Sequence, residues 1–287
     1  MRLARTTIIA LSFIILLSTG ACAQQGSGTT PLRPSLWLEM PQTDPADSAN
    51  VYTVVMKIDG VNQRNYSFLW NESRMTSSWV AYPLCRGNMG QGKRSNAFGL
   101  CPLLPADKQP LLEKGYRKGN GGWYSRGHQI PSGDRLSYKA NVQTFYGINM
   151  TPQDEGLNGG VWESLESRAR SLALRCDTLY VVTGCTYDGY QGEYVLDNNG
   201  RQVDVPTGYY KALLMLSSGE FHGCGYFFEN RPYESGSLKR SMMMPLSELE
   251  RMTGMTFFPN LKKIVGEERY DELKSENPLE QGCWGRN

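Results

Sequence analysis

The chain has 287 residues, of which 40% are hydrophobic and 20% charged, so a predominantly disordered protein is excluded. Residues 1–21 contain two arginines and no acidic residue, which leaves 28 basic and 28 acidic residues in the rest of the chain. This balance excludes a uniformly basic protein that coats nucleic acid through its overall charge.

The N-terminus has the pattern of an export signal. Arg2 and Arg5 precede an apolar run at residues 8–17, which is too short to span a bilayer stably. The small residues 18–21 then lead to Cys22, a pattern that resembles a bacterial lipobox, in which the cysteine becomes the acylated N-terminus. We therefore predict a signal peptide over residues 1–22 and a lipid anchor at Cys22.

Thr19 departs from the lipobox pattern because leucine is usual there, so an ordinary signal peptide cut near Ala21 or Ala23 is the alternative. Both alternatives predict an exported protein. A membrane-anchored lipoprotein on the periplasmic or cell-surface side is preferred over a freely secreted protein. Small and polar residues at 23–35 predict a flexible tether, and residues 36–287 are expected to form a single domain.

The first part of that domain reads as strands followed by a long loop. Alternating, β-branched and aromatic residues predict strands at 51–58, 66–70 and 77–82, which form an antiparallel opening section. Residues 84–122 are rich in Gly and Pro and predict a surface loop that contains at most a short helix at 111–116. Long loops in compact domains usually serve function.

The second part mixes helices with strands. Apolar residues spaced three to four apart predict a helix over 162–174. Strands are predicted at 179–183, 194–196, 209–216 and 222–228, and helices at 246–252, ended by Gly254, and at about 262–275. The expected fold class is α+β, with a central antiparallel sheet flanked by helices.

Six cysteines follow Cys22: Cys85, Cys101, Cys176, Cys185, Cys224 and Cys283. An even number in an exported chain suggests disulfides, although fifteen pairings are possible. A local Cys85–Cys101 pair is preferred, whereas Cys176–Cys185 is disfavoured because a strand is expected between them. Free buried thiols are the alternative. The spacings form no zinc-binding pattern.

Positive charge gathers in the long loop and just beyond it. Residues 86–139 contain ten Lys or Arg and three acidic residues. Such a patch in a neutral protein can focus its field on a polyanion, although a solvated charged loop explains it equally well.

Residues that could hydrolyse a phosphodiester bond lie close together in the sequence. Within about 40 residues stand Arg126, His128, Asn149, Asn158 and Glu166. Hydrolysis needs a base near neutral pH, which imidazole supplies, and positive charge to stabilise the transition state. Each residue alone has a structural alternative: a core histidine, a turn or N-cap asparagine, a solvated carboxylate or a surface arginine.

The spacing of these residues favours a shared catalytic role over separate structural roles. The run SRGHQIPSGDR (125–135) is followed by NMTPQxxxLNxGxWxxLE, which starts at Asn149 and places asparagines nine apart with Glu166 eight further on. Both blocks resemble the DNA/RNA non-specific endonuclease family, the ββα-metal nucleases. Further similar blocks follow in the family's order at residues 79–84, 183–188, 205–214 and 249–261, so the resemblance covers roughly residues 36–261.

The resemblance implies a ββα-metal (His-Me finger) active site and a role for each residue. His128 would be the general base and Asn158 the one direct protein ligand of a hydrated Mg²⁺, with Mn²⁺ or another divalent ion possible. Glu166 would hold metal-bound water, Asn149 would shape the site, and Arg126 would face the scissile phosphate or leaving oxygen.

Arg94, in GKRSN, matches the family's upstream phosphate-binding arginine, and Arg135 is a third candidate for substrate binding. The chain departs from the family at Ser125, where aspartate usually precedes Arg-Gly-His, and this leaves open what orients Arg126. It also departs at Gly208, where histidine is frequent.

The sequence thus predicts a magnesium-dependent, sugar-non-specific endonuclease. Its substrates would be DNA and RNA, bound through the phosphate backbone along residues 86–139, and its membrane contact would be the N-terminal lipid anchor. No protein partner is evident. One alternative is an enzyme of the same fold that acts on a different phosphodiester or on only one of DNA and RNA. The other is a non-catalytic nucleic-acid-binding or structural lipoprotein that retains the fold.

Overall fold

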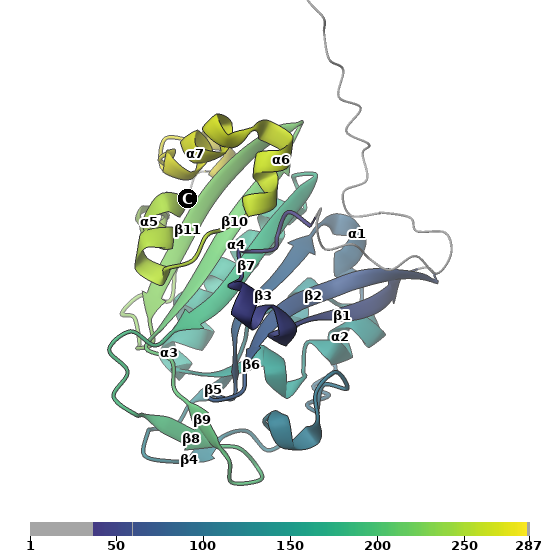
Figure 1. The fold of residues 1–287 in the computed structure, drawn as a ribbon, viewed down its shortest axis with the longest axis vertical. Helices are drawn as coiled ribbons and strands as arrows, with labels where there is room; N and C mark the ends of the chain where they lie inside the picture. Colours follow the sequence, from purple (N-terminus) through teal and green to yellow (C-terminus); the bar gives the residue numbers. More distant parts are fainter. Residues whose placement is uncertain (1–36, 59, 286–287) are drawn as a thin grey trace, which may run out of the picture.

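A computed structural model describes residues 37–58 and 60–285. The predicted signal peptide, Cys22 and the predicted tether lie outside these residues. The described chain folds around a six-stranded sheet in which every neighbouring pair is antiparallel (Figure 1). In spatial order its strands are β1 (Val51–Ile58), β2 (Val61–Asn71), β3 (Thr76–Leu84), β7 (Thr178–Thr186), β10 (Gly208–Ser217) and β11 (Glu220–Glu229).

Successive side chains of the central strands point to opposite sides of the sheet. Those on both sides are buried, so the sheet has a hydrophobic cluster on each face. In β10, Tyr209 and Leu213 belong to one hydrophobic cluster, whereas Tyr210 and Leu214 belong to the other. Each cluster needs a covering layer, and helices supply one on each face.

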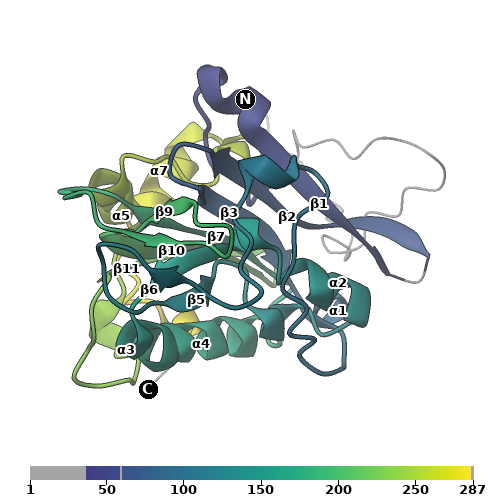
Figure 2. The ribbon, with the colours of Figure 1, turned by 90° about the horizontal axis from the view of Figure 1, so that it is seen from below.

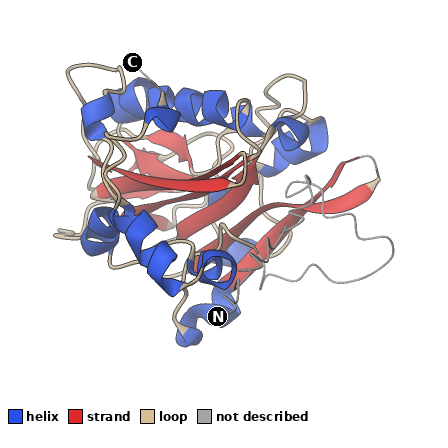
Figure 3. Ribbon diagram, turned by 90° about the horizontal axis from the view of Figure 1, so that it is seen from above, coloured by secondary structure: helices blue, strands red, loops and turns tan. Residues whose placement is uncertain are grey.

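The two layers are built from different parts of the chain (Figures 2 and 3). The C-terminal helices α5 (Leu246–Thr253), α6 (Lys262–Val265) and α7 (Glu267–Ser275) cover one face. The other face carries the two-stranded unit of β5 (Ser125–His128) and β6 (Met150–Gln153), together with α3 (Glu155–Leu157) and α4 (Glu163–Ala173).

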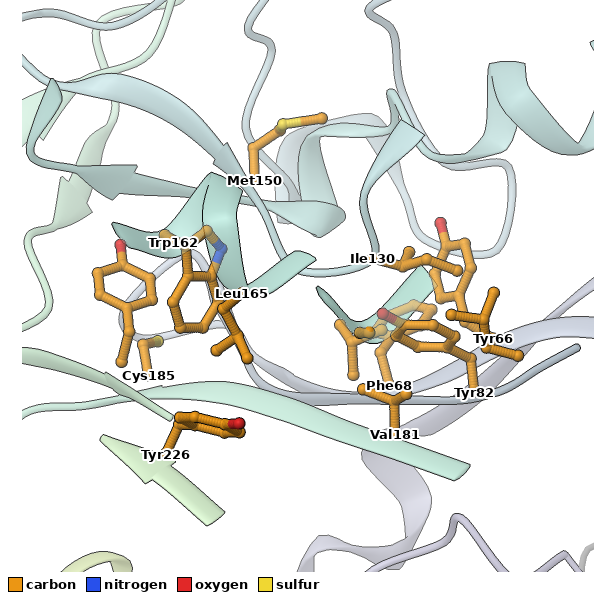
Figure 4. Close-up of a cluster of buried hydrophobic side chains, with 14 of the residues drawn as sticks. Tyr66, Phe68, Tyr82, Ile130, Met150, Trp162, Leu165, Val181, Cys185 and Tyr226 are labelled. Carbon is orange, nitrogen blue, oxygen red and sulfur yellow. The ribbon is translucent and has the colours of Figure 1, made fainter. Parts of the chain in front are cut away.

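Helix α4 is attached to the sheet through large apolar side chains. Trp162 packs edge-on against Tyr209, with ring centroids 5.6 Å apart, and Leu165 follows one turn later (Figure 4). Both are fully buried. The ββα unit packs on a face of the sheet, because α4 needs an apolar surface to cover its buried stripe.

The remaining elements are small. Helices α1 (Arg86–Met89) and α2 (Tyr138–Gln143) flank the β1–β3 side, and a three-stranded sheet is formed by β4 (Arg117–Lys118), β8 (Tyr194–Leu196) and β9 (Gln202–Asp204).

The α+β class, the central antiparallel sheet and its flanking helices are confirmed. The strand predicted at 77–82 runs on through Pro83 to Leu84. Strand β2 pairs with β3 only as far as Ala81, so Pro83 lies where one side of β3 has no ladder partner and its missing N–H costs nothing there. No helix forms at 111–116, and the helix predicted at 262–275 is broken at Gly266, whose φ is +84°.

The preferred Cys85–Cys101 disulfide is wrong. Among the described cysteines, Cys101, Cys176, Cys185, Cys224 and Cys283 are free thiols. The turn at Cys101 is fixed by Gln109 instead. The Gln109 amide accepts a hydrogen bond from the Cys101 N–H at 2.6 Å and donates one to its carbonyl at 2.7 Å.

Candidate active site

The β5–β6 hairpin presents Arg126 and His128 on the same side. In its register Arg126 lies opposite Pro152 and His128 opposite Met150. Because side chains two apart in a strand share a face, the guanidinium and the imidazole point the same way. Gly127, between them, lets the two strands meet: a β-carbon there would lie 2.6 Å from Cβ of Gln153.

His128 is a buried, neutral imidazole with one unused nitrogen. Only 9% of the residue is exposed, and its ring meets Phe145 edge-on at 5.0 Å. Burial, and next the charge of Arg94, lowers the pKa of His128 to about 3, against a backbone hydrogen bond to Arg126 that raises it. Nε2 has no hydrogen-bond partner among the residues described. The lone pair of this nitrogen is therefore free at neutral pH, and a bound anion that offsets the charge of Arg94 would make it a stronger base.

Phe98 and two carbonyl groups orient Arg126, which answers the question raised by Ser125. The guanidinium carbon lies 3.5 Å from the centroid of the Phe98 ring, and Nη1 donates to the carbonyls of Leu112 (2.7 Å) and Glu113 (3.0 Å). In the described part of the chain, Nε and Nη2 have no such partner. This leaves a two-donor edge, which suits a phosphate.

Arg94 is held in the same way on the neighbouring ring. Its guanidinium lies 4.8 Å from the Phe145 centroid, and its Nε donates to Asn96 at 2.8 Å. Phe98 and Phe145 themselves pack edge-on at 4.9 Å, so the two rings carry both arginines. Neither arginine forms an ion pair within residues 37–58 and 60–285, and their uncompensated charges favour an anion between them.

We expect Phe98→Leu to lower kcat about tenfold with little change in KM, because Arg126 would keep its charge but lose the surface that fixes its plane. Phe98→Tyr, which keeps the ring, should retain most of the activity. Steady-state cleavage kinetics measure both variants. In a double-mutant cycle, Phe98→Leu should add nothing to Arg126→Ala; additive losses would show that Phe98 acts elsewhere.

Asn149 is a buried clamp whose amide is fully used. Its Oδ1 accepts from the Ile130 N–H at 3.0 Å, and its Nδ2 donates to the carbonyls of Ile130 (2.9 Å) and Thr144 (2.8 Å). It therefore fixes the backbone just after His128 and has no free polar atom to offer a metal or substrate.

Asn158 begins a distorted part of the helix that ends in α4. Residues Asn158–Trp162 form a π-helical turn, and Gly160 inside it has non-helical angles (φ −110°, ψ −116°). The path from Asn158 to Glu166 is therefore not a regular α-helix. Asn158 is half-buried, and no hydrogen bond of its side-chain amide is found in the described chain. π-helical turns are frequent at functional sites.

Glu166 lies in α4 with 14% of its side chain exposed. Burial raises its pKa to about 7; Lys211 and Arg170 oppose this shift, whereas Asp134 and Glu163 add to it. The negative charge of Glu166 also acts on Arg94, where it opposes the lowering of the arginine pKa by burial. A nearby cation would stabilise the charged form of this carboxylate, which burial disfavours.

The oxygen donors present suit a hard divalent cation. Asn158 offers an amide oxygen and Glu166 a carboxylate, which are the ligand types that Mg²⁺ prefers. No group of three His, Cys, Asp or Glu side chains that could hold a metal is found in the described residues. An ion here would accordingly keep most of its coordination sites for water and phosphate.

Arg135, predicted as a substrate-binding residue, must be corrected. It is fully buried, and its Nε and Nη2 donate to the side chain and carbonyl of Asn65 at 2.9 and 3.0 Å. Further bonds reach the carbonyls of Asp134 (2.8 Å) and Pro83 (2.7 Å). Its donors are committed to joining β2, β3 and the segment after His128, so they cannot reach a phosphate.

Comparison with known proteins agrees with this geometry. The model of the DNA/RNA non-specific endonuclease family matches residues 47–264. The chain is 32% identical over 220 residues to mitochondrial endonuclease G of Bos taurus, covering 71% of each chain. It is 27% identical over 203 residues to a nuclease of Serratia marcescens, covering 70% of this chain and 75% of that one.

A solved structure shares the fold. The crystal structure of a complex named EndoG/EndoGI aligns with a TM-score of 0.59 and 22% identity, over 82% of this chain and 95% of the other. The site and fold define a nuclease with a ββα active site. The chain belongs to the DNA/RNA non-specific endonuclease family.

Proposed function

We propose that this nuclease is a magnesium-dependent, sugar-non-specific endonuclease of DNA and RNA in which His128 is the general base. The observation that carries the proposal is the unpartnered Nε2 of His128 beside two arginines that lack ion-pair partners in the described chain. A phosphate bound between the arginines would offset the charges that lower the His128 pKa, so the base would strengthen when substrate is present.

Each residue of the site then has its own role in hydrolysis. His128 Nε2 takes the proton of the attacking water, and the free edge of Arg126 stabilises the charge that develops on the phosphate or leaving oxygen. Arg94 holds the adjoining phosphate oxygens. Asn158 would bind the ion directly and Glu166 through water. The ion would supply further charge stabilisation at the phosphate.

We expect no selectivity between DNA and RNA, because the groups of the site contact the phosphate and not the sugar or the bases. Arg94, Arg126 and His128 offer groups that match phosphate, which DNA and RNA share. Exposed cations nearby in the sequence, including Lys93 and Lys139, would attract the backbone, whereas buried Arg135 would not. The second candidate function is that of an enzyme that acts on only one of the two nucleic acids. Cleavage assays on DNA and RNA distinguish the two candidates.

The purified chain should cleave plasmid DNA, single-stranded DNA and RNA with Mg²⁺, and a chelator should abolish all three activities. Cleavage of only one class would support the narrower enzyme. No cleavage with Mg²⁺, Mn²⁺ or Ca²⁺ would favour a binding protein that retains the fold.

We also propose that residues 1–22 direct export and that Cys22 carries a lipid anchor, because of the charge and hydrophobicity pattern of the N-terminus. In the part of the chain that the structure describes, no helix is both long and apolar enough to cross a bilayer. Labelled fatty acid should be incorporated into the bacterially expressed full chain but not into Cys22→Ala. Equal labelling of both would reject the anchor.

A further inference from the structure

A solvent-exposed tryptophan lies just before strand β5, which carries Arg126 and His128. Trp123 is 76% exposed, more than any other exposed large hydrophobic residue in the described chain. It comes three residues before Arg126, so its backbone lies no more than about 11 Å from that arginine. This distance equals roughly three stacked base steps of 3.4 Å.

The loop that carries Trp123 is fixed on both sides. Before it, the Gly121 N–H donates to the carbonyl of Tyr194 at 3.1 Å, and the Asn120 amide accepts from the Tyr194 N–H at 2.6 Å. After it, the Tyr124 hydroxyl is hydrogen-bonded to Glu193. An indole that remains in solvent although its neighbours are anchored is a preformed flat surface.

Three cations precede this loop in the chain. Lys114, Arg117 and Lys118 are exposed, and none has an ion-pair partner within the described residues. Their segment is tied to the active site, because Arg126 donates to the carbonyl of Glu113, directly before Lys114. Figure 1 shows β4, β8 and β9 gathered at the end of the molecule next to β5.

We propose that Trp123 and the cations of segment 114–118 form an arm that binds a single-stranded stretch of nucleic acid beside the scissile phosphate. The indole stacks on one base, and the cations contact the flanking phosphates. Because every base has a π-face, the arm reads no sequence, but it needs a base free of its duplex neighbours. This proposal rests on the proposed function and adds to it a preference for unpaired substrate.

The test compares cleavage of a single-stranded oligonucleotide with cleavage of a duplex of the same sequence, at one salt concentration. Trp123→Ala should lower kcat/KM for the single strand by about 5- to 100-fold, the range for removal of one base–aromatic stack, and change the duplex value less than about twofold. Trp123→Phe should keep most of the activity. The control is Ile264→Ala, since Ile264 is also an exposed large hydrophobic residue (43%) but lies on α6, which covers the opposite face of the sheet.

Salt dependence tests the cations separately. Lys114→Gln with Lys118→Gln should reduce the slope of log K for single-strand binding against log salt by about 0.7 for each phosphate that is no longer neutralised. An equal loss on both substrates in Trp123→Ala, or a loss in Ile264→Ala as large as that in Trp123→Ala, would overturn the arm.

If the wild type cleaved nothing, the proposed function would fail, but the arm could still be judged by binding. Single-stranded oligonucleotide should quench tryptophan fluorescence in the wild type and much less in Trp123→Ala. Quenching that is equal in the two proteins would reject the arm.

Discussion

His128→Ala should lower nuclease activity by about 10²- to 10⁴-fold, the usual contribution of a positioned general base. Nε2 of His128 is the one imidazole nitrogen in the arginine-lined site without a hydrogen-bond partner among the described residues. With the ring gone, no other group of the site can take a proton at neutral pH, because Arg94 and Arg126 remain charged and Glu166 is expected to be occupied with the metal ion.

The matched control is the second histidine of the chain, His222, which lies on β11 opposite Met215, far along the sequence from the catalytic hairpin. His222→Ala should retain wild-type rates. Single-turnover cleavage of a labelled duplex measures both variants. Wild-type activity in His128→Ala, with the fold intact by circular dichroism, would remove the base assignment.

Asn158→Ala should weaken the apparent affinity for Mg²⁺ by more than about 100-fold, because loss even of residues that only support metal ligands costs about 10- to 100-fold. No cluster of acidic side chains stands ready in the described chain to replace the amide oxygen. Asn158→Asp, which keeps an oxygen at the same place, should recover much of the activity.

Titration of cleavage against Mg²⁺ concentration measures this effect. An exposed amide on β2, Asn62, provides the control, and Asn62→Ala should titrate like the wild type. An Asn158→Ala variant with an unchanged Mg²⁺ titration would show that the ion is held elsewhere.

Buried, neutral His128 should also make the fold sensitive to acid. Its pKa is about 3 in the folded chain and near 6.5 when unfolded, so between these values the unfolded state binds the extra proton. Stability is therefore lost as pH falls through this window, by up to about 1.4 kcal/mol per pH unit.

Denaturant unfolding from about pH 6.5 to about pH 4, without metal, should show that the wild type loses stability relative to His128→Asn. Parallel pH profiles for the two proteins would mean that the imidazole is solvated in the folded chain.

Sequence reasoning succeeded where a local pattern dictates the outcome. The strand at residues 51–58 and the αL cap at Gly254, with φ +68°, follow from β-branched residues and from glycine placement. The ββα site that the family resemblance implies includes a strand pair, and β5 and β6 form one at His128. Gly127 in the Arg-Gly-His run permits the close approach of Gln153 that this pair requires.

It failed where the outcome depends on distant partners. Arg135 looks like a surface cation in sequence, but its donors are satisfied by backbone groups that lie about 50 and 70 residues earlier in the chain. Phe98 stands in a glycine-rich loop without periodicity, so nothing local indicates that it supports Arg126. The π-turn at Asn158 was hidden because its composition resembles an ordinary helix start.

The most direct test locates the ion and the phosphate together. Crystals of His128→Ala with Mn²⁺ and a short DNA should give one anomalous manganese peak beside the Asn158 side-chain oxygen. That ion should contact a phosphate whose other side faces the position left by the imidazole. A manganese ion remote from Asn158 would contradict the account. So would a phosphate that does not face position 128.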